Sequence, residues 1–371
     1  MKTEMNLTHD GKYLGMVVGG SLHRGVEVHL DSSSSVEDVK VGTFVTIKGK
    51  KGRFFGVITD IELGVTDAAF KNNPHQTRDP FLAEIISGTN AYGTISVLPT
   101  LTIRSVPDDL TDLSPAKNIP SHFSETFAAS DQDVQMVFGT EDQGHFWIGN
   151  PLEMQTKVCL NLRALVERSM GVFGKTGTGK TFLTRLLLMG ILKADMASAL
   201  IFDMHSEYGW QGRDSDRSKA VKGLKQLFGS KVAVFTLDED NARHRQVPVD
   251  EVVNIGYSDI DPDDVEILRE NLGLSEVAAQ ATYNLERKFG ARNWLESFLN
   301  IEGRDAIFDL ANDISVNPQA LAALHNRLSR LKRYGFLSST VRIDSVRRII
   351  EHLDRGMHVV LEFGRYGNDL N

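Results

Sequence analysis

The stretch from Gly174 to Thr181, "GKTGTGKT", matches the pattern G-x-x-x-x-G-K-[ST] at every specified position. Upstream, "MGVFG" predicts a short apolar strand, and downstream "FLTRLLLMGILKA" has the apolar spacing of a helix. A strand, a glycine-rich loop and a helix in this order form the opening unit of a phosphate-binding α/β core. This feature constrains the fold more than any other, and it predicts an α/β protein.

The residue types of this loop suit a nucleotide phosphate. Glycines permit tight turns and close approach of the backbone, so that N–H groups and the helix N-terminus point at the β-phosphate. Lys180 adds a charge between the β- and γ-phosphates, and the Thr181 hydroxyl can ligate Mg²⁺. We therefore expect ATP and Mg²⁺ as cofactors. The predicted nucleotide contacts are Gly174, Lys175, Thr176, Gly177, Thr178, Gly179, Lys180, Thr181 and Phe182.

The next apolar strand, "SALIFD", ends at Asp203. Read by itself, it has the form of a Walker B strand, whose terminal aspartate binds Mg²⁺. This interpretation predicts Asp203 and Thr181 as metal ligands. His205 and Glu207 follow closely, but an H-x-E pair without a third ligand is more typical of a hydrogen-bonded loop than of a metal site.

The region before the phosphate loop has a different sequence pattern. Short apolar runs alternate with glycine turns from about Tyr13 to Ile103, as in "GVEVHL" and "FFGVITDIELG". This spacing predicts a small all-β barrel or sandwich over residues 1–104. Residues 105–145 are rich in Pro, Asp and Ser and predict a connector between two domains.

Composition limits the classes of protein to which this chain can belong. A chain of 371 residues with 41% hydrophobic and 24% charged residues is typical of a multidomain globular protein. No apolar run approaches the roughly 18 residues that cross a bilayer. A single cysteine, Cys159, excludes an internal disulfide framework and a cysteine-rich metal site, which fits a cytoplasmic location. The net charge of −8 argues against a uniformly basic surface, so any polyanion would be held in a restricted place.

The sequence also resembles the HerA family of hexameric ATPases, relatives of FtsK-type DNA pumps. The resemblance rests on "GKTGTGKT", on D-x-H-x-E-Y from Asp203 to Tyr208, and on the approach segment "VCLNLRALVERSMGVFG". The N-terminal region is similar to the barrel domain of that family. The resemblance implies a RecA-like P-loop NTPase core, interrupted by a helical insertion and preceded by the barrel.

Within that family the Walker B strand comes after the insertion, and this places the domains. The resemblance divides the chain into a first part of the core at 146–256, a helical insertion at 257–355 and a returning core strand at 356–371. Asp261 before Pro262 predicts the start of an insertion helix. "VVLEFG" imitates Walker B only weakly, through Glu362. We therefore expect the true Walker B strand beyond Asn371, in a longer translocase.

Two further catalytic residues are expected besides Lys180: Arg168 from the resemblance, and Glu207 from its place just after Asp203. Arg168 matches an arginine that reaches a nucleotide across a subunit interface, although a surface arginine is the alternative. Glu207 is expected near the γ-phosphate or polarising a water. The implied assembly is a homo-oligomeric, hexameric ring, without a membrane, that pulls DNA through its central channel. A nuclease or other effector protein is expected at the barrel end.

Alternative functions remain open at this point. A scaffold ring of an antiviral defence complex would use ATP to tune assembly rather than DNA movement, and a small-molecule kinase would leave the barrel without a role. Two groups of basic residues are candidates for phosphate contacts, or else ordinary solvated faces. The first contains Arg327, Arg330, Lys332, Arg333, Arg347 and Arg348, and the second contains Arg213, Arg217, Lys219, Lys222 and Lys225.

Overall fold

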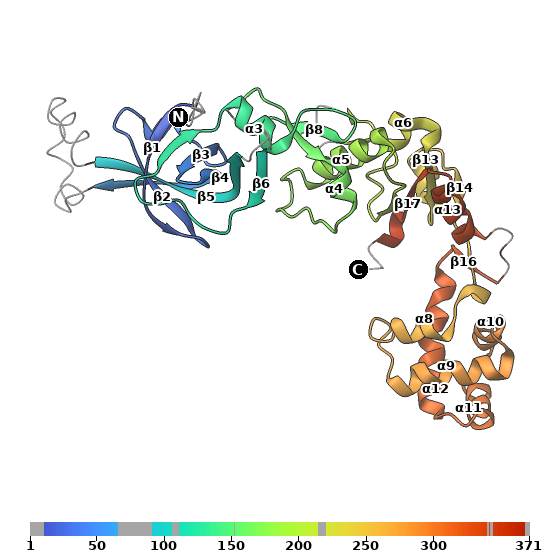
Figure 1. The fold of residues 1–371 in the computed structure, drawn as a ribbon. Helices are drawn as coiled ribbons and strands as arrows, with labels where there is room; N and C mark the ends of the chain where they lie inside the picture. The colour runs from blue at the N-terminus through green and yellow to red at the C-terminus, as the bar shows by residue number, and fades with distance from the viewer. Residues whose placement is uncertain are drawn as a thin grey trace, which may run out of the picture. The chain divides into compact units, whose positions relative to one another are not determined.

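The computed structural model describes residues 11–65, 91–105, 111–151, 153–213, 220–339, 341 and 344–367. The chain divides into two compact units, Met1–Met170 and Gly171–Asn371. Each unit has its own sheet and its own core, so they are described in turn (Figure 1).

The first unit is built on an antiparallel sheet that closes on itself. Its strands run in the order β2-β1-β7-β3-β4-β5-β6, and an additional pairing of β2 with β5 closes all but β6 into a six-stranded barrel. The strands are β1 (Tyr13–Ser21), β2 (Gly25–Leu30), β3 (Phe44–Gly49), β4 (Gly52–Val65), β5 (Ala91–Ser105), β6 (Thr111–Pro115) and β7 (Glu125–Ala128). The predicted barrel is therefore confirmed.

The barrel core follows from alternation along strands such as β2. In β2, Val26, Val28 and Leu30 are buried whereas Glu27 and His29 point outward. These side chains pack with Val45, Ile47, Ile95 and Val97 from other strands. Closure leaves the six barrel strands without a free edge, which is the usual way for a small β-domain to avoid unpaired backbone groups.

The barrel unit extends further along the chain than we expected. Strands β6 and β7 lie in the segment predicted as a connector, because their backbones complete ladders with β5 and with β1 and β3. Helix α3 (Asp131–Phe138) then packs Val134 against Phe55 and Ile103 of the barrel. Strands β8 (His145–Gly149) and β9 (Val158–Asn161) and helix α4 (Leu162–Val166) also belong to this unit, although the expected core began at residue 146.

A buried ion pair fixes α3 on the barrel. Arg53 Nη1 of β4 lies 2.6 Å from Asp133 Oδ1, and their side chains are only 13% and 5% exposed. The other oxygen of Asp133 accepts hydrogen bonds from the backbone N–H and the hydroxyl of Ser130, which caps the helix. One carboxylate therefore serves both as a helix cap and as an anchor to the sheet.

The second unit has a parallel sheet of order β10-β17-β13-β14. Its strands are β10 (Leu200–Asp203), β13 (Val232–Thr236), β14 (Glu251–Val252) and β17 (His358–Glu362). Side chains of α5 (Lys180–Ala194) and α6 (Leu224–Phe228) pack with Val232, Val234 and Val360 in one cluster. Ile349 and Leu353 of α13 (Ser345–Asp354) pack with Phe235 and Val359 in another. The alternating residues of the strands thus face helices on both sides, as in a doubly wound α/β fold.

The strand predicted at "MGVFG" is wrong. Residues 171–175 form no strand, and Phe173 is 93% exposed. A strand needs a neighbouring ladder for its N–H and C=O groups. Among the described residues, no strand pairs with this segment, and β10 pairs only with β17. The glycine-rich loop therefore follows a segment without regular secondary structure.

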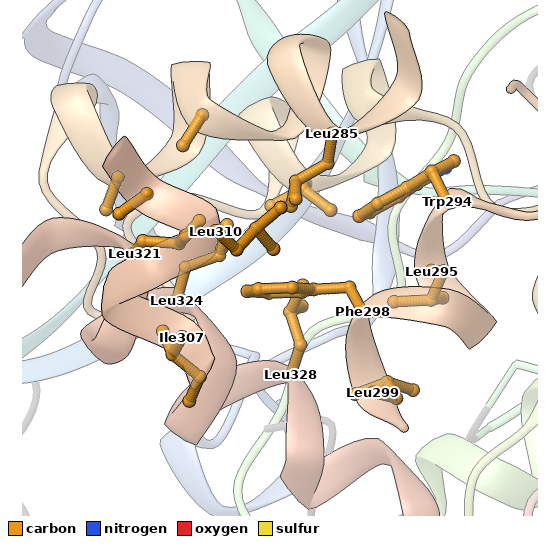
Figure 2. Close-up of a cluster of buried hydrophobic side chains, with 14 of the residues drawn as sticks. Leu285, Trp294, Leu295, Phe298, Leu299, Ile307, Leu310, Leu321, Leu324 and Leu328 are labelled. Carbon is orange, nitrogen blue, oxygen red and sulfur yellow. The ribbon is translucent and has the colours of Figure 1, made fainter. Parts of the chain in front are cut away.

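The helical insertion has a core of its own. Its helices are α8 (Pro262–Ile267), α9 (Glu276–Phe289), α10 (Trp294–Leu299), α11 (Arg304–Asp313) and α12 (Pro318–Leu328). Figure 2 shows Leu285, Trp294, Phe298, Leu324 and Leu328 packed together at its centre. Helix α8 starts as predicted, with Pro262 in its first turn and Asp264 accepting a hydrogen bond from the N–H of Asp261.

A short parallel pairing joins the insertion to the sheet unit. Strand β15 (Ile255–Gly256) pairs with β16 (Leu337–Ser338) where the chain leaves and returns. Helix α13 lies beyond this pairing and packs on β17, so it belongs to the core rather than to the insertion predicted over 257–355. Among the described residues, no helix is long and apolar enough to cross a membrane.

Candidate nucleotide site

The phosphate loop is ordered by its own backbone and side chains. Thr178 donates from its backbone N–H and its hydroxyl to the carbonyl of Lys175, at 3.3 and 2.7 Å. Lys180 Nζ donates to the same carbonyl at 2.8 Å, which turns its charge back over the loop. Gly177 and Gly179 adopt φ values of +83° and +88°, which favour glycine. The motif thus closes into a compact curl at the start of α5.

The N-terminus of α5 is open to an anion. Its N-cap is Gly179, and no side chain caps the helix, so its first N–H groups are left for a ligand. Residues 174–179 are exposed, and Lys180 and Thr181 are half-buried. An uncapped helix start, a lysine charge and a neighbouring hydroxyl are the groups that a Mg²⁺-bound nucleotide phosphate requires. The residues of the loop therefore fit ATP and Mg²⁺.

Asp203 ends β10 and shapes the turn that follows it. It is 1% exposed, and its two carboxylate oxygens accept the backbone N–H groups of Glu207 and Tyr208 at 2.9 and 2.8 Å. Burial raises the pKa of the Tyr208 phenol, helped by the charges of Asp203 and Glu207 and opposed by a hydrogen bond with Thr184 of α5. The D-x-H-x-E-Y motif therefore forms one rigid turn. That Asp203 also binds Mg²⁺ stays a prediction.

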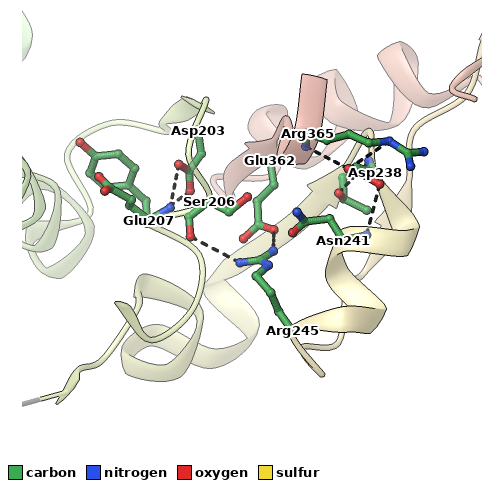
Figure 3. A network of polar contacts seen from close by, with 10 residues as sticks. Asp203, Ser206, Glu207, Asp238, Asn241, Arg245, Glu362 and Arg365 are labelled. Atoms are coloured by element: carbon green, nitrogen blue, oxygen red, sulfur yellow. Dashed lines mark hydrogen bonds and ion pairs between the residues drawn. The ribbon is translucent and has the colours of Figure 1, made fainter. Parts of the chain in front are cut away.

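Glu362 lies beside Asp203, because β10 and β17 are register partners at these two residues. Its side chain is fully buried and pairs with the guanidinium of Arg245. Burial raises the pKa of the Glu362 carboxyl, and Arg245 acts in the opposite direction. Figure 3 shows Arg245 between Glu362 and the Ser206 backbone. Sequence reasoning noticed Glu362 only as a weak Walker B imitation and missed Arg245.

Another buried carboxylate, that of Asp238, lies just after the end of β13. Asp238 is 2% exposed and accepts hydrogen bonds from the backbone N–H groups of Asn241 and Arg365, at 3.2 and 2.9 Å. It caps α7 (Glu239–His244) and holds the turn after β17 through the Arg365 contact (Figure 3). Polar side chains thus cluster at the carboxyl ends of three neighbouring strands, the edge of a parallel sheet where ligands usually bind.

The P-loop helix contacts the motif directly. Arg185 of α5 is 8% exposed, and its Nη2 donates to the backbone carbonyl of Glu207. Among the described residues, the structure brings the phosphate loop, α5 and the D-x-H-x-E-Y turn into one connected arrangement. No local pattern marks Arg185, because helical spacing alone does not distinguish a buried arginine from an exposed one.

The remaining predicted residues are placed as follows. Arg168 follows α4, is exposed and belongs to the first unit, whereas the phosphate loop belongs to the second. His205 is exposed and Glu207 half-buried. Among the described residues, no group of three or more His, Cys, Asp or Glu side chains is arranged to hold a metal ion. Phe182 is 55% exposed at the first turn of α5.

Several of the basic residues singled out as phosphate contacts have partners within the protein. Lys332 donates to the Leu299 carbonyl, and Arg347 and Arg348 pair with Glu351 and Glu251. Lys225 pairs with Asp250. These contacts favour the structural interpretation for Lys332, Arg347, Arg348 and Lys225. Arg217 and Lys219 lie outside the described residues.

Comparison with known families places much of the chain in one described family. Residues 146–370 match the family described as Helicase HerA, central domain. The match covers the phosphate loop, the D-x-H-x-E-Y turn, the insertion and β17, and it begins within the first structural unit. No curated protein sequence matches the chain.

Proposed function

Because the chain belongs to the HerA family of P-loop ATPases, we propose that it hydrolyses ATP in a hexameric ring of identical subunits and moves DNA through the central channel. The observation that supports this proposal most is the phosphate loop itself, with Lys180 folded over it and the uncapped start of α5 facing outward. We propose a cytoplasmic protein whose barrel binds a nuclease or another effector.

The residues have distinct roles in this proposal. The loop N–H groups and Lys180 hold the β- and γ-phosphates, and the Thr181 hydroxyl, with Asp203, binds Mg²⁺, which would neutralise phosphate charge. Glu207 orients the attacking water. Arg168 reaches the nucleotide of a neighbouring subunit and stabilises the charge that develops on the γ-phosphate.

The decisive test is Lys180→Ala. Turnover should disappear and ATP binding should weaken, because the γ-phosphate loses its main side-chain partner. The matched control is Lys175→Ala, because the motif leaves this position open and the substitution keeps the backbone N–H and carbonyl of the loop. Unchanged turnover in Lys180→Ala would refute the assignment of the phosphate site.

DNA movement is tested separately from hydrolysis. A translocase should show ATPase activity stimulated by DNA and should displace a strand or a bound protein, and Lys180→Ala should lose both. The alternative is supported by a different result: DNA does not stimulate turnover and no strand or bound protein is displaced, but ATP still changes the size of the assembly. The protein would then be a scaffold ring, as in an antiviral defence complex.

A further inference from the structure

One buried arginine and one half-buried arginine hold consecutive carbonyl groups of the D-x-H-x-E-Y turn, and we infer that Arg185 and Arg245 are positioning residues for the Glu207 carboxylate. The inference rests on the proposed function, in which Glu207 orients the attacking water. Neither arginine touches the nucleotide in this scheme. Each acts through the backbone of the turn.

Arg185 links the turn to the phosphate loop. It lies on the helix that begins at Lys180, and its Nη2 donates to the Glu207 carbonyl. Its side chain is almost fully buried, and its Nε has no hydrogen-bond partner among the described residues. Burial of a guanidinium is costly unless the charge meets a specific partner. The contact with Glu207 gives this burial a role.

Arg245 links the same turn to β17. Its Nη2 pairs with the buried Glu362 carboxylate, and its Nη1 donates to the Ser206 carbonyl at 3.4 Å. Ser206 has a φ of +54°, a left-handed conformation that is unfavourable for a residue with a side chain. Such a conformation persists when surrounding contacts hold it. Arg245 supplies one of these contacts.

The peptide groups around Glu207 are therefore held from three elements. Asp203 of β10 accepts the Glu207 N–H, Arg185 of α5 donates to the Glu207 carbonyl, and Arg245 donates to the carbonyl just before it. The Glu207 carboxylate is carried by a turn whose position is set by the phosphate-loop helix and by β17. A shift of α5 on nucleotide binding would move this carboxylate with it.

The kinetic test uses Arg185→Met and Arg245→Lys, with Arg243→Met as the matched control. Arg243 precedes Arg245 closely, but it is exposed, and among the described residues its guanidinium pairs with Glu239. The positioning variants should lose turnover by about 10-fold or more, because a displacement of about 1 Å in a reacting group can cost about 100-fold. Their affinity for ATP should stay within about 2-fold of wild type, and the control should match wild type in both. Wild-type turnover in both positioning variants would overturn the inference.

A double variant separates positioning from a general loss of structure. If Arg185 acts through Glu207, Arg185→Met should add little to the loss already caused by Glu207→Gln. Losses that multiply would show that the two residues act independently. This outcome would contradict the inference even if Arg185→Met alone were slow.

The last measurement does not depend on turnover. In the absence of nucleotide, the amides of Glu207 and Tyr208 should exchange hydrogen faster in Arg185→Met and Arg245→Lys than in wild type or Arg243→Met. Equal protection in all four proteins would overturn the inference, whereas an inactive wild type with the expected exchange would overturn only the proposed function. If Arg185→Met does not fold, Arg185→Lys replaces it, because lysine keeps the charge but lacks the guanidinium fork.

Discussion

Asp203 and Glu362 are register partners at the carboxyl ends of two parallel strands, yet their carboxylates have different kinds of partners. Asp203 accepts two backbone N–H groups, and Glu362 pairs with the Arg245 guanidinium. Two acidic groups side by side are thus stabilised by separate contacts. This arrangement suggests how to distinguish a structural role of Asp203 from a role in metal binding.

Asp203→Asn should destabilise the turn, because an amide can accept only one of the two N–H groups and presents a donor to the other. The expected loss is about 1–3 kcal/mol in the free energy of unfolding. If Asp203 also binds Mg²⁺, the Mg²⁺ concentration that half-saturates turnover should rise as well. Urea unfolding and a Mg²⁺ titration of the ATPase measure the two effects independently. A loss of stability with an unchanged Mg²⁺ requirement would leave Asp203 with the structural role alone.

Arg168→Ala tests whether hydrolysis is shared between subunits. An arginine supplied by a neighbour can contribute ~10³ or more to turnover, whereas an exposed arginine without such a role contributes little. The homo-oligomer of Arg168→Ala should therefore be nearly inactive. Mixing these subunits with Lys180→Ala subunits should restore part of the activity, since each supplies what the other lacks. Near-wild-type turnover of Arg168→Ala alone would end the idea.

Phe298→Ala tests the independence of the insertion core. Phe298 is fully buried among the insertion helices, so the cavity should cost about 3–5 kcal/mol (Figure 2). Because the sheet unit has separate clusters around Val234 and Phe235, nucleotide binding should survive. Thermal unfolding and ATP affinity measured on the same sample check both statements. A loss of ATP affinity that accompanies the loss of stability would show that the two cores are coupled.

The pH dependence of stability should report His358. This side chain is fully buried, and its Nδ1 accepts the Ala199 N–H at 3.2 Å. Burial lowers its pKa, with Asp195 opposing and Lys231 adding to the effect. Between the lowered pKa and the ordinary histidine value, the unfolded chain binds more protons. The free energy of unfolding should therefore rise with pH through this window and level off above it.

Urea unfolding at a series of pH values measures this dependence. His358→Gln should flatten the rise of unfolding free energy with pH. His325→Gln is measured for comparison, because burial also lowers the pKa of His325. Glu362 has the opposite sign: burial raises its pKa, so stability falls as pH rises from the ordinary value towards the raised one. Glu362→Gln should remove that contribution. Identical slopes for wild type and His358→Gln would contradict the prediction for His358.

Local features of the sequence predicted much of the fold. The glycine spacing from Gly174 to Gly179 and the apolar period of α5 depend only on residues close in sequence, so they could be predicted. The P-loop fold class that they indicate is confirmed. The strand at "MGVFG" failed because a strand also needs a pairing partner. Helix α13 was predicted as a helix, but its place on β17 depends on tertiary packing that its own period does not reveal.

The parts of the site that were missed are long-range. Arg185 and Glu207 are 22 residues apart, and Arg245 and Glu362 are 117 residues apart. No local pattern connects such pairs. Arg185 lies in an apolar helix whose spacing does not show that the arginine is buried, and Arg245 follows a short charged helix. Asp203 shows the same limit in another form, because its position was evident but its two backbone partners were not.

The pairing of β15 with β16 has a consequence for how the chain can vary. Ile255 and Leu337 are neighbours across a ladder, and adjacent strands lie about 4.8 Å apart. Because the two strands are parallel, a crossover connection of about a dozen residues or more has to join them, so the five-helix segment could be exchanged for another crossover without stretching the sheet. Insertions at such a point add little entropic cost as they lengthen. The pairing is therefore a natural grafting point, where new recognition domains can be added during evolution or by engineering.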